Sequence, residues 1–201
     1  AGEVINEALM KELHVNGTQR LINQAKGKVG RWIQLSSVGA YGTIRSGIVT
    51  EESKEQSTGV YETTKTLSDN LVKDSGIPYV ILRPSNVFGK GMSNQSLYKM
   101  LSMIQQGMFF YIGKSGTLLN YIHVDKVVEA LINCGNNKNA IGEVFILSQS
   151  ITIEKMTSSF MAGLNMERKI IRFPEWLVRM AAYTCRIIPK FPLTSSRIDA
   201  L

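Results

Sequence analysis

The sequence predicts an α/β protein built on a parallel β-sheet. Two short apolar segments, residues 31–36 and 79–83, have the length and composition of buried strands. Between them, residues 60–73 carry apolar side chains at helical spacing, and Gly76 and Pro78 end that helix. A strand, a crossover helix and a second apolar strand form a right-handed parallel unit, so the two strands are expected to share one sheet.

The rest of the chain continues this mixture of helices and strands. Residues 3–25 have apolar side chains at helical spacing and are expected to form one or two helices, ended by Gly27. The polar residues 37–59 are expected to form a loop. After Pro84 the pattern predicts two helices, residues 96–106 and 125–133, and three strands, residues 109–112, 121–124 and 143–147.

Composition narrows the classes of function. With 201 residues, 44% hydrophobic and 19% charged, the chain has the make-up of an ordinary globular protein. Cys134 and Cys185 lie far apart in the sequence, and neither has a second thiol or a histidine at metal-ligand spacing. This arrangement argues against a disulfide framework and against a metal site. It favours a reducing, cytoplasmic setting. The net charge of +7 is scattered, so nucleic acid is not expected as a partner, whereas a phosphorylated small molecule remains open.

The apolar segments are too short to cross a membrane. None approaches the roughly 20 residues that span a bilayer, and the first residues lack a signal-peptide pattern. A transmembrane segment is therefore not expected. Residues 176–188 form an amphipathic pattern with two arginines; they are expected to pack on their own domain, with contact to a membrane surface as the alternative.

Side chains with catalytic chemistry gather where the predicted strands end. Tyr61 and Lys65 are four residues apart on the predicted helix and therefore project from one face, although such a pair by itself is more often a solvated surface pair. Ser36 and Ser37 follow the first strand, and residues 84–86 follow the second. Because the carboxyl ends of parallel strands meet at one edge of a sheet, a hydroxyl, a phenol, an amine and an amide are expected in one crevice.

These groups could share a proton transfer. A phenol has an ordinary pKa of about 10 and is a weak base near neutrality unless a nearby cation stabilises its phenolate. Lys65 would supply that cation, and Tyr61 could then take a proton from an alcohol or give one to a carbonyl. Ser37 would donate a hydrogen bond to the same oxygen and hold it in line.

Five short motifs follow one another along nearly the whole chain. They are His14-Val-Asn-Gly-Thr18, Leu35-Ser-Ser-Val-Gly-Ala-Tyr-Gly42, Tyr61-Glu-Thr-Thr-Lys65, Leu82-Arg-Pro-Ser-Asn-Val-Phe-Gly89 and Asn120-Tyr-Ile-His-Val-Asp125. In this order and at this spacing, the chain resembles the extended short-chain dehydrogenase/reductase family, also called the NAD-dependent epimerase/dehydratase family.

The resemblance implies a Rossmann-like parallel sheet flanked by helices, with a smaller, mixed C-terminal part that binds substrate. Residues 1–90 would be the C-terminal half of the dinucleotide-binding domain, and residues 91–201 mainly the substrate-binding part, with a sheet strand near residues 143–147. The family's first strands and its glycine-rich phosphate turn are not found in the 201 residues, and residues 193–201 resemble a point at which family members continue. Both ends are therefore expected to be truncated relative to the family.

The resemblance also implies roles for the catalytic residues. Ser37 would orient the substrate, and Tyr61 would act as the acid and the base. Lys65 would lower the pKa of Tyr61 and bind the nicotinamide ribose. Tyr61 and Lys65 would therefore belong to the cofactor site as well.

Three residues after the second strand are implied in binding. Pro84 and Ser85 would line the nicotinamide of NAD or NADP, and Asn86 would face the substrate, with closure of a turn as its alternative role. The choice between NAD and NADP stays open, because the residue that reads the ribose 2′ position precedes these motifs in the family.

The function that the resemblance implies is an NAD(P)-dependent oxidoreductase or epimerase acting on a secondary alcohol or ketone, most often a nucleotide sugar. A 3β-hydroxysteroid- or flavanone-type ketone reductase and a non-catalytic dinucleotide-binding sensor are the alternatives, and a homodimer is left open. Two positions depart from the family pattern. His14 replaces the usual Asn, and Leu119 replaces a frequent phosphate-binding Arg, for which Arg172 or Lys114 could substitute.

Overall fold

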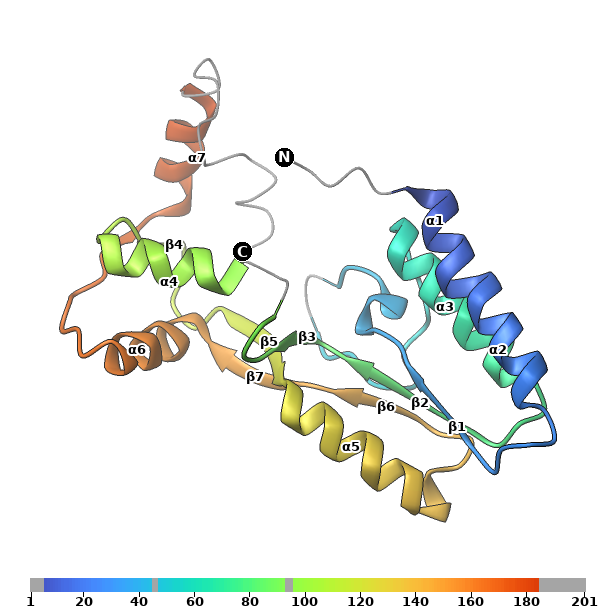
Figure 1. Cartoon of the computed structure of the whole chain (residues 1–201). Helices are drawn as coiled ribbons and strands as arrows, with labels where there is room; N and C mark the ends of the chain where they lie inside the picture. The colour runs from blue at the N-terminus through green and yellow to red at the C-terminus, as the bar shows by residue number, and fades with distance from the viewer. Residues whose placement is uncertain (1–5, 45–46, 93–95, 185–201) are drawn as a thin grey trace. The chain divides into compact units, whose positions relative to one another are not determined.

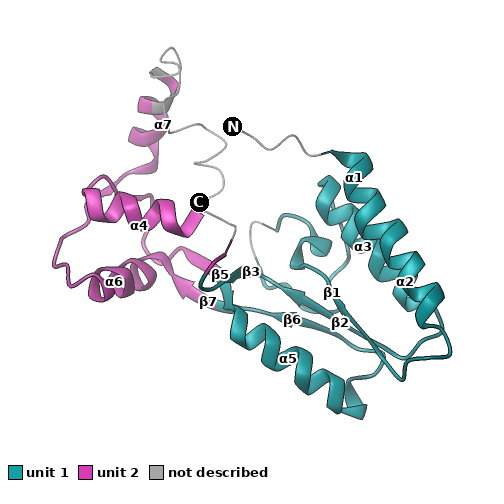
Figure 2. Ribbon diagram, viewed as in Figure 1, with its two compact units in different colours: residues 1–90, 120–149 teal, residues 91–119, 150–201 magenta. Residues whose placement is uncertain are grey.

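The computed structural model describes residues 6–44, 47–92 and 96–184. The chain forms two compact units, each made of two segments (Figure 2). The first unit comprises Ala1–Lys90 and Asn120–Gln149, and the second comprises Gly91–Leu119 and Ser150–Leu201. The segment expected to be mainly substrate-binding, residues 91–201, therefore contributes residues 120–149 to the unit that carries the predicted strand–helix–strand motif.

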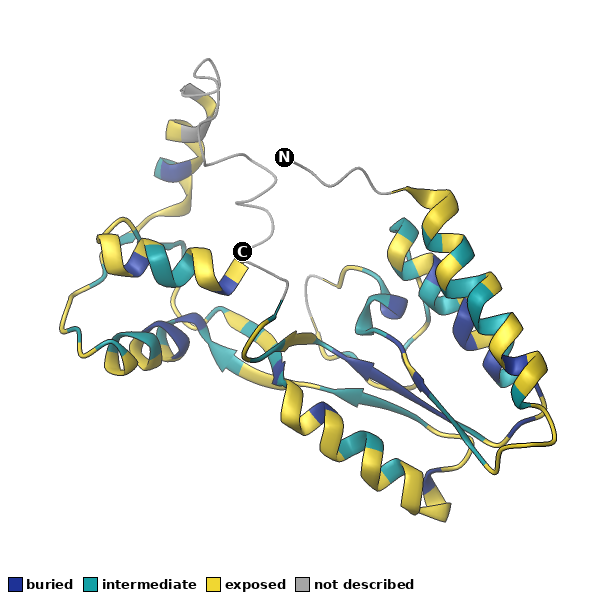
Figure 3. Ribbon diagram, viewed as in Figure 1, coloured by how far each residue is buried: buried dark blue, intermediate teal, exposed yellow. Residues whose placement is uncertain are grey.

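A parallel sheet forms the centre of the first unit, which confirms the predicted fold class. Its strands are β1 (Trp32–Leu35), β2 (Tyr79–Pro84) and β6 (Val144–Leu147), in the order β1-β2-β6. The register pairs Leu35 with Leu82, and Leu82 with Phe145. The central strand β2 is buried from Val80 to Pro84, as Figure 3 shows. Two parallel neighbours and helices on both faces explain its nearly unbroken apolar sequence.

Helices cover both faces of this sheet (Figure 1). Alternate side chains of β2 point to opposite faces, so Val80 and Leu82 form a buried cluster with Ala140 and partly buried side chains of α5 (Val124–Asn136). On the other face lies α3 (Val60–Lys73), whose Val72 packs against Ile22 of α2 (Gly17–Ala25). This alternation directs Arg83, the one charged residue of β2, to the α3 side.

The first helical segment is continuous but irregular. It consists of α1 (Glu7–Lys11), one turn of π-helix, η1 (Glu12–Asn16), and α2. Such a turn accommodates an extra residue within a helix and is frequent at functional sites. His14 lies in this turn.

The second unit contains the helices α4 (Ser96–Gln106), α6 (Ile153–Gly163) and α7 (Glu175–Thr184) and the parallel pair β4 (Tyr111–Ile112) and β8 (Arg172–Phe173). Val178 of α7 packs against Phe110 and Ile112. Of the amphipathic segment predicted over residues 176–188, residues 185–188 lie outside the described chain. No helix within the described ranges is long and apolar enough to cross a membrane.

A second three-stranded sheet and two short helical turns complete the described elements. The sheet has the order β3-β5-β7, with β3 (Asn86–Phe88), β5 (Leu118–His123) and β7 (Gln149–Thr152). The turns are the 3-10 helices η2 (Val38–Tyr41) and η3 (Lys138–Ala140). The prediction of a plain loop over residues 37–59 was therefore wrong at its start, where Ala40 and Tyr41 of η2 are buried.

Candidate active site

Ser37 lies at the carboxyl end of β1, in a turn that the backbone holds in place. The amide of Ser36 donates a hydrogen bond of 2.7 Å to the carbonyl of Leu82 and so extends the pairing with β2. Ser37 is the N-cap of η2, and its Oγ accepts a hydrogen bond of 3.1 Å from the amide of Gly39. The hydroxyl proton of Ser37 is left for another partner.

Tyr61 and Lys65 lie on the first two turns of α3, with the phenol 40% exposed. Lys65 Nζ donates a hydrogen bond of 2.5 Å to the carbonyl of Leu35, the last residue of β1. Gly39 of η2 lies so close to Glu62 that a Cβ there would collide with the Glu62 side chain. The Ser37 turn therefore packs on the beginning of α3, the helix that carries Tyr61 and Lys65.

His14 reaches this site from the π-helical turn. Its Nδ1 lies 2.8 Å from Thr64 Oγ1, and its ring meets that of Tyr61 edge to face, with centroids 5.4 Å apart. Thr64 Oγ1 donates its single proton to a backbone carbonyl of the preceding turn, that of Val60 at 2.9 Å or of Tyr61 at 3.0 Å. We therefore assign the Nδ1–H tautomer to His14, which leaves Nε2 as an acceptor.

The local environment shifts the pKa values of these groups. Burial, followed by the negative charge of Glu62, raises the pKa of Tyr61, the opposite of the lowering expected from Lys65. Burial lowers the pKa of Lys65, and the charge of Asp69 acts against that change. Burial and the charge of Lys65 both lower the pKa of His14, which favours a neutral imidazole.

The residues after β2 lie at the same edge of the sheet. Because Leu35 pairs with Leu82, Ser37 and Pro84 each lie two residues beyond that pair. The amide of Ser85 donates to the carbonyl of Leu147 at 2.9 Å, but its Oγ is buried without a hydrogen-bond partner among the described residues. Asn86 Nδ2 donates to the carbonyl of Asn120 at 3.2 Å, so part of this amide serves the second sheet.

Polar groups at this edge fit a dinucleotide's nicotinamide half. Ser85 supplies a buried hydroxyl that needs a hydrogen-bond partner. The ammonium of Lys65 has three protons, and the Leu35 carbonyl accepts one of them, so the others can bind a ligand. When bound there, a nicotinamide would supply the acceptor or donor of a hydride. The assignment of Pro84 and Ser85 to the cofactor, and of Asn86 to the substrate, stays a prediction.

The chain matches the family model described as the NAD-dependent epimerase/dehydratase family over residues 3–147. The chain belongs to this family. The match confirms the family resemblance of the five sequence motifs, and with it the Rossmann-like class of the parallel sheet and the NAD-type cofactor of the family.

Two curated relatives illustrate the distance within the family. The UDP-glucose 4-epimerase of Vibrio cholerae is 22% identical over 182 residues, which cover 86% of this chain and 55% of that protein. The short-chain dehydrogenase/reductase family 42E member 1 of Bos taurus is 25% identical over 209 residues, covering 90% of this chain and 52% of the relative. The chain thus spans about half the length of these relatives.

Solved structures share the fold. The UDP-glucuronic acid 4-epimerase of Bacillus cereus in complex with NAD superposes with a TM-score of 0.71 at 19% identity, covering 87% of this chain and 60% of that one. RMD from Pseudomonas aeruginosa, complexed with NADPH, gives a TM-score of 0.67 at 19% identity and covers 87% and 68% of the two chains.

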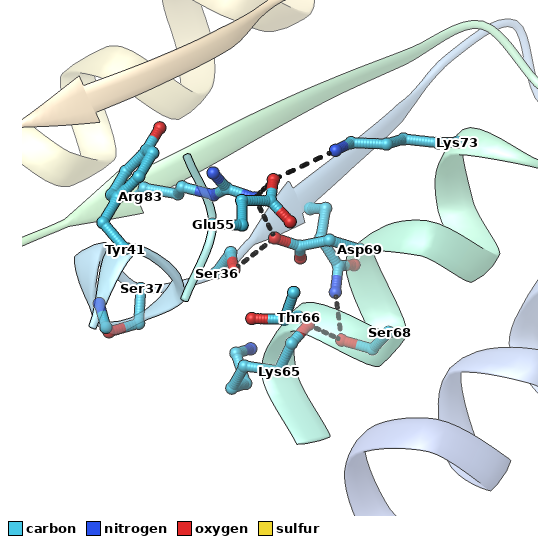
Figure 4. Close-up of polar contacts among 12 residues, drawn as sticks. Ser36, Ser37, Tyr41, Glu55, Lys65, Thr66, Ser68, Asp69, Lys73 and Arg83 are labelled. Atoms are coloured by element: carbon cyan, nitrogen blue, oxygen red, sulfur yellow. Dashed lines mark hydrogen bonds and ion pairs between the residues drawn. The ribbon is translucent and has the colours of Figure 1, made fainter. Parts of the chain in front are cut away.

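Two residues of the candidate site were missed by the sequence analysis: Asp69 and Arg83, which form a buried ion pair to which Ser36 is hydrogen-bonded (Figure 4). Both had a signal. Asp69 follows Lys65 by four residues and so shares its helical face, and Arg83 is a charged residue within an otherwise apolar strand, where burial requires a partner.

Proposed function

We propose that the protein is an NAD(P)-dependent oxidoreductase or epimerase acting on a secondary alcohol or ketone. The observation that carries this proposal is the hydrogen bond from Lys65 to Leu35, which fixes the ammonium beside the Ser37 turn, with Tyr61 one turn earlier on the same helix. Non-catalytic binding of a dinucleotide would not require these three side chains at one strand end.

Each residue then has a distinct task. Tyr61 moves a proton at the substrate oxygen, and the hydroxyl of Ser37 donates a hydrogen bond to that oxygen. Lys65 stabilises the phenolate of Tyr61 and bonds the cofactor ribose. Nε2 of neutral His14 accepts a hydrogen bond from water or from a polar group of the cofactor, so His14 can take the place of the family's usual Asn.

A nucleotide sugar is the substrate class that the relatives favour. The curated and structural relatives include a UDP-glucose and a UDP-glucuronic acid 4-epimerase. Leu119 cannot bind a diphosphate, and Arg172, expected to compensate, instead pairs with Glu154 and donates to the carbonyl of Lys114 at 2.9 Å. The exposed side chain of Lys114 is the remaining candidate cation of the two.

The engagement of Arg172 also supports a second candidate function. A ketone without phosphate, of the steroid or flavanone kind, needs no diphosphate-binding arginine. Reduction of such a ketone is therefore the alternative activity to test.

The test uses the protein at its full natural length with NAD(H) and NADP(H), assayed against nucleotide sugars and uncharged ketones. In Tyr61→Phe the ring remains but the proton is lost, so turnover should fall by roughly 10²–10⁴-fold while cofactor affinity changes little. Wild-type turnover in this variant, or no NAD(P)-dependent turnover of either substrate class, would contradict the proposal.

A further inference from the structure

A polar network with a buried centre lies beside the Ser37 turn (Figure 4). Its centre is Asp69 on α3, whose side chain is 0% exposed. One carboxylate oxygen, Oδ2, accepts a hydrogen bond of 2.7 Å from Ser36 Oγ and one of 3.1 Å from Arg83 Nη2. The network therefore joins the end of β1, the middle of α3 and the end of β2.

Arg83 extends the network to the segment that follows η2. Its guanidinium, in a residue that is 1% exposed, also donates to Glu55 Oε1 at 2.6 Å and lies over the ring of Tyr41, 4.8 Å from the centroid. Lys73 reaches the same Glu55 oxygen at 3.3 Å. Both ends of the turn that carries Ser37 are thus anchored, at Ser36 by Asp69 and at Tyr41 by Arg83.

Asp69 also lies one helical turn beyond Lys65. Residues four apart on a helix are neighbours on one face. The groups facing Lys65 are Tyr61 and Asp69 on α3, neutral His14 on η1 and the Leu35 carbonyl on β1. Asp69 supplies the negative charge in this set, and the guanidinium of Arg83 favours its ionised form.

Resting on the function proposed above, we propose that Asp69 is a positioning residue of the active site: its carboxylate holds the Ser36–Ser37 turn against α3 and stabilises the ammonium of Lys65. The pKa directions agree with this role. Burial lowers the pKa of Lys65 and raises that of Asp69, and the attraction between the two charges opposes both changes.

The substitution Asp69→Asn removes the negative charge of this side chain while keeping its size and shape. The Oδ1 atom of Asp69 has no hydrogen-bond partner among the described residues, so an amide nitrogen can take its place while the amide oxygen still accepts from Ser36 and Arg83. Ser36→Ala is the matched control, because it removes the bond to the turn and keeps the charge. In the full-length protein Ser36→Ala should lower kcat by roughly 10²-fold through misplacement of Ser37. Asp69→Asn keeps the hydrogen bond to Ser36, so its loss of kcat should come from the missing negative charge beside Lys65.

The charge effect is read by NMR titration of the Lys65 side chain in the same full-length protein, with its signal assigned from Lys65→Arg. Asp69→Asn should make Lys65 lose its proton at lower pH, and Ser36→Ala should leave that titration unchanged. A Lys65 titration that is the same in Asp69→Asn and wild type, or that moves equally in Ser36→Ala, would overturn the proposal.

A reciprocal variant covers the case in which Asp69→Asn does not fold. In Lys65→Met, the Asp69 carboxyl signal should titrate at higher pH than in wild type, because the neighbouring cation is gone. An unchanged Asp69 titration would also overturn the proposal. Since neither titration needs cofactor or substrate, both remain decisive if the proposed enzymatic activity is not found.

Discussion

Lys65 Nζ lies 2.5 Å from the carbonyl oxygen of Leu35, so the helix that carries Tyr61 is joined to the strand that leads to Ser37. An ammonium has three protons, and one of them is used by this bond. Lys65 can therefore hold the end of β1 and still bind a ligand on its other side.

The first prediction concerns the two functions proposed for Lys65, stabilisation of the Tyr61 phenolate and binding of the cofactor ribose. Lys65→Met keeps the apolar stem but loses the charge, so turnover should fall together with NAD(P) affinity, the latter by roughly tenfold or more because a charge-assisted hydrogen bond is lost. Steady-state kinetics and calorimetric titration measure the two effects. Lys73→Met, on the same helix but paired with Glu55, should leave both constants near those of wild type.

The second prediction is a pH dependence set by Glu62. Burial and then the charge of Glu62 raise the pKa of Tyr61, so Glu62→Gln should lower that pKa. The phenolate then forms at lower pH, and the rise of kcat/KM with pH for alcohol oxidation should shift to lower pH. An unshifted profile in Glu62→Gln would show that its charge does not reach the phenol.

The third prediction concerns the turn that carries Ser37. Gly42 has φ of 74° and ψ of −167°, a region almost restricted to glycine, and a Cβ there would collide with the backbone carbonyl of Gln56. Gly42→Ala should lower the free energy of unfolding by about 3 kcal/mol or more. Gly76→Ala is the control: its φ is 75° but the space around it is open, so the loss should be only about 1 kcal/mol. Urea denaturation compares them, and equal losses would contradict the steric argument.

The fourth prediction reassigns Arg172. Besides Glu154, its guanidinium bonds the carbonyls of Gly113 and Lys114 at 3.3 and 2.9 Å, and the Glu154 carboxylate accepts from the Gly116 amide at 3.2 Å. Arg172→Ala should therefore destabilise the second unit by about 1 kcal/mol, whereas Lys114→Ala should change stability by less than about 0.5 kcal/mol. If Arg172→Ala unfolds like wild type but weakens nucleotide-sugar binding, the original assignment of Arg172 to the diphosphate is the better one.

The sequence predicted the elements that local patterns determine. The bounds of α3 and α4 were predicted as observed, and β2 and β6 to within one residue, because apolar periodicity and glycine or proline stops are local signals. The strands β3, β7 and β8 were not predicted, since each is short and begins with a polar residue, so none forms a continuous apolar run.

The candidate site likewise contains residues that local motifs predict and side-chain pairs that only the tertiary structure determines. Ser37, Tyr61 and Lys65 lie in motifs, and their placement just after β1 and on α3 could be anticipated. The pairing of Asp69 with Arg83 could not, because it depends on how far α3 is rotated over β2, which is a tertiary property. The pairing of Arg172 with Glu154 escaped for the same reason, being formed between side chains 18 residues apart.

The π-helical turn at Glu12–Asn16 makes the position of His14 depend on residue count as well as residue identity. Removing a single residue from this turn would restore a regular α-helix and rotate everything before it by about 100° about the helix axis relative to α2. The bond from His14 to Thr64 would then be lost with no change to either side chain. A one-residue insertion or deletion in this turn would therefore change the surroundings of Tyr61 as effectively as a substitution of His14.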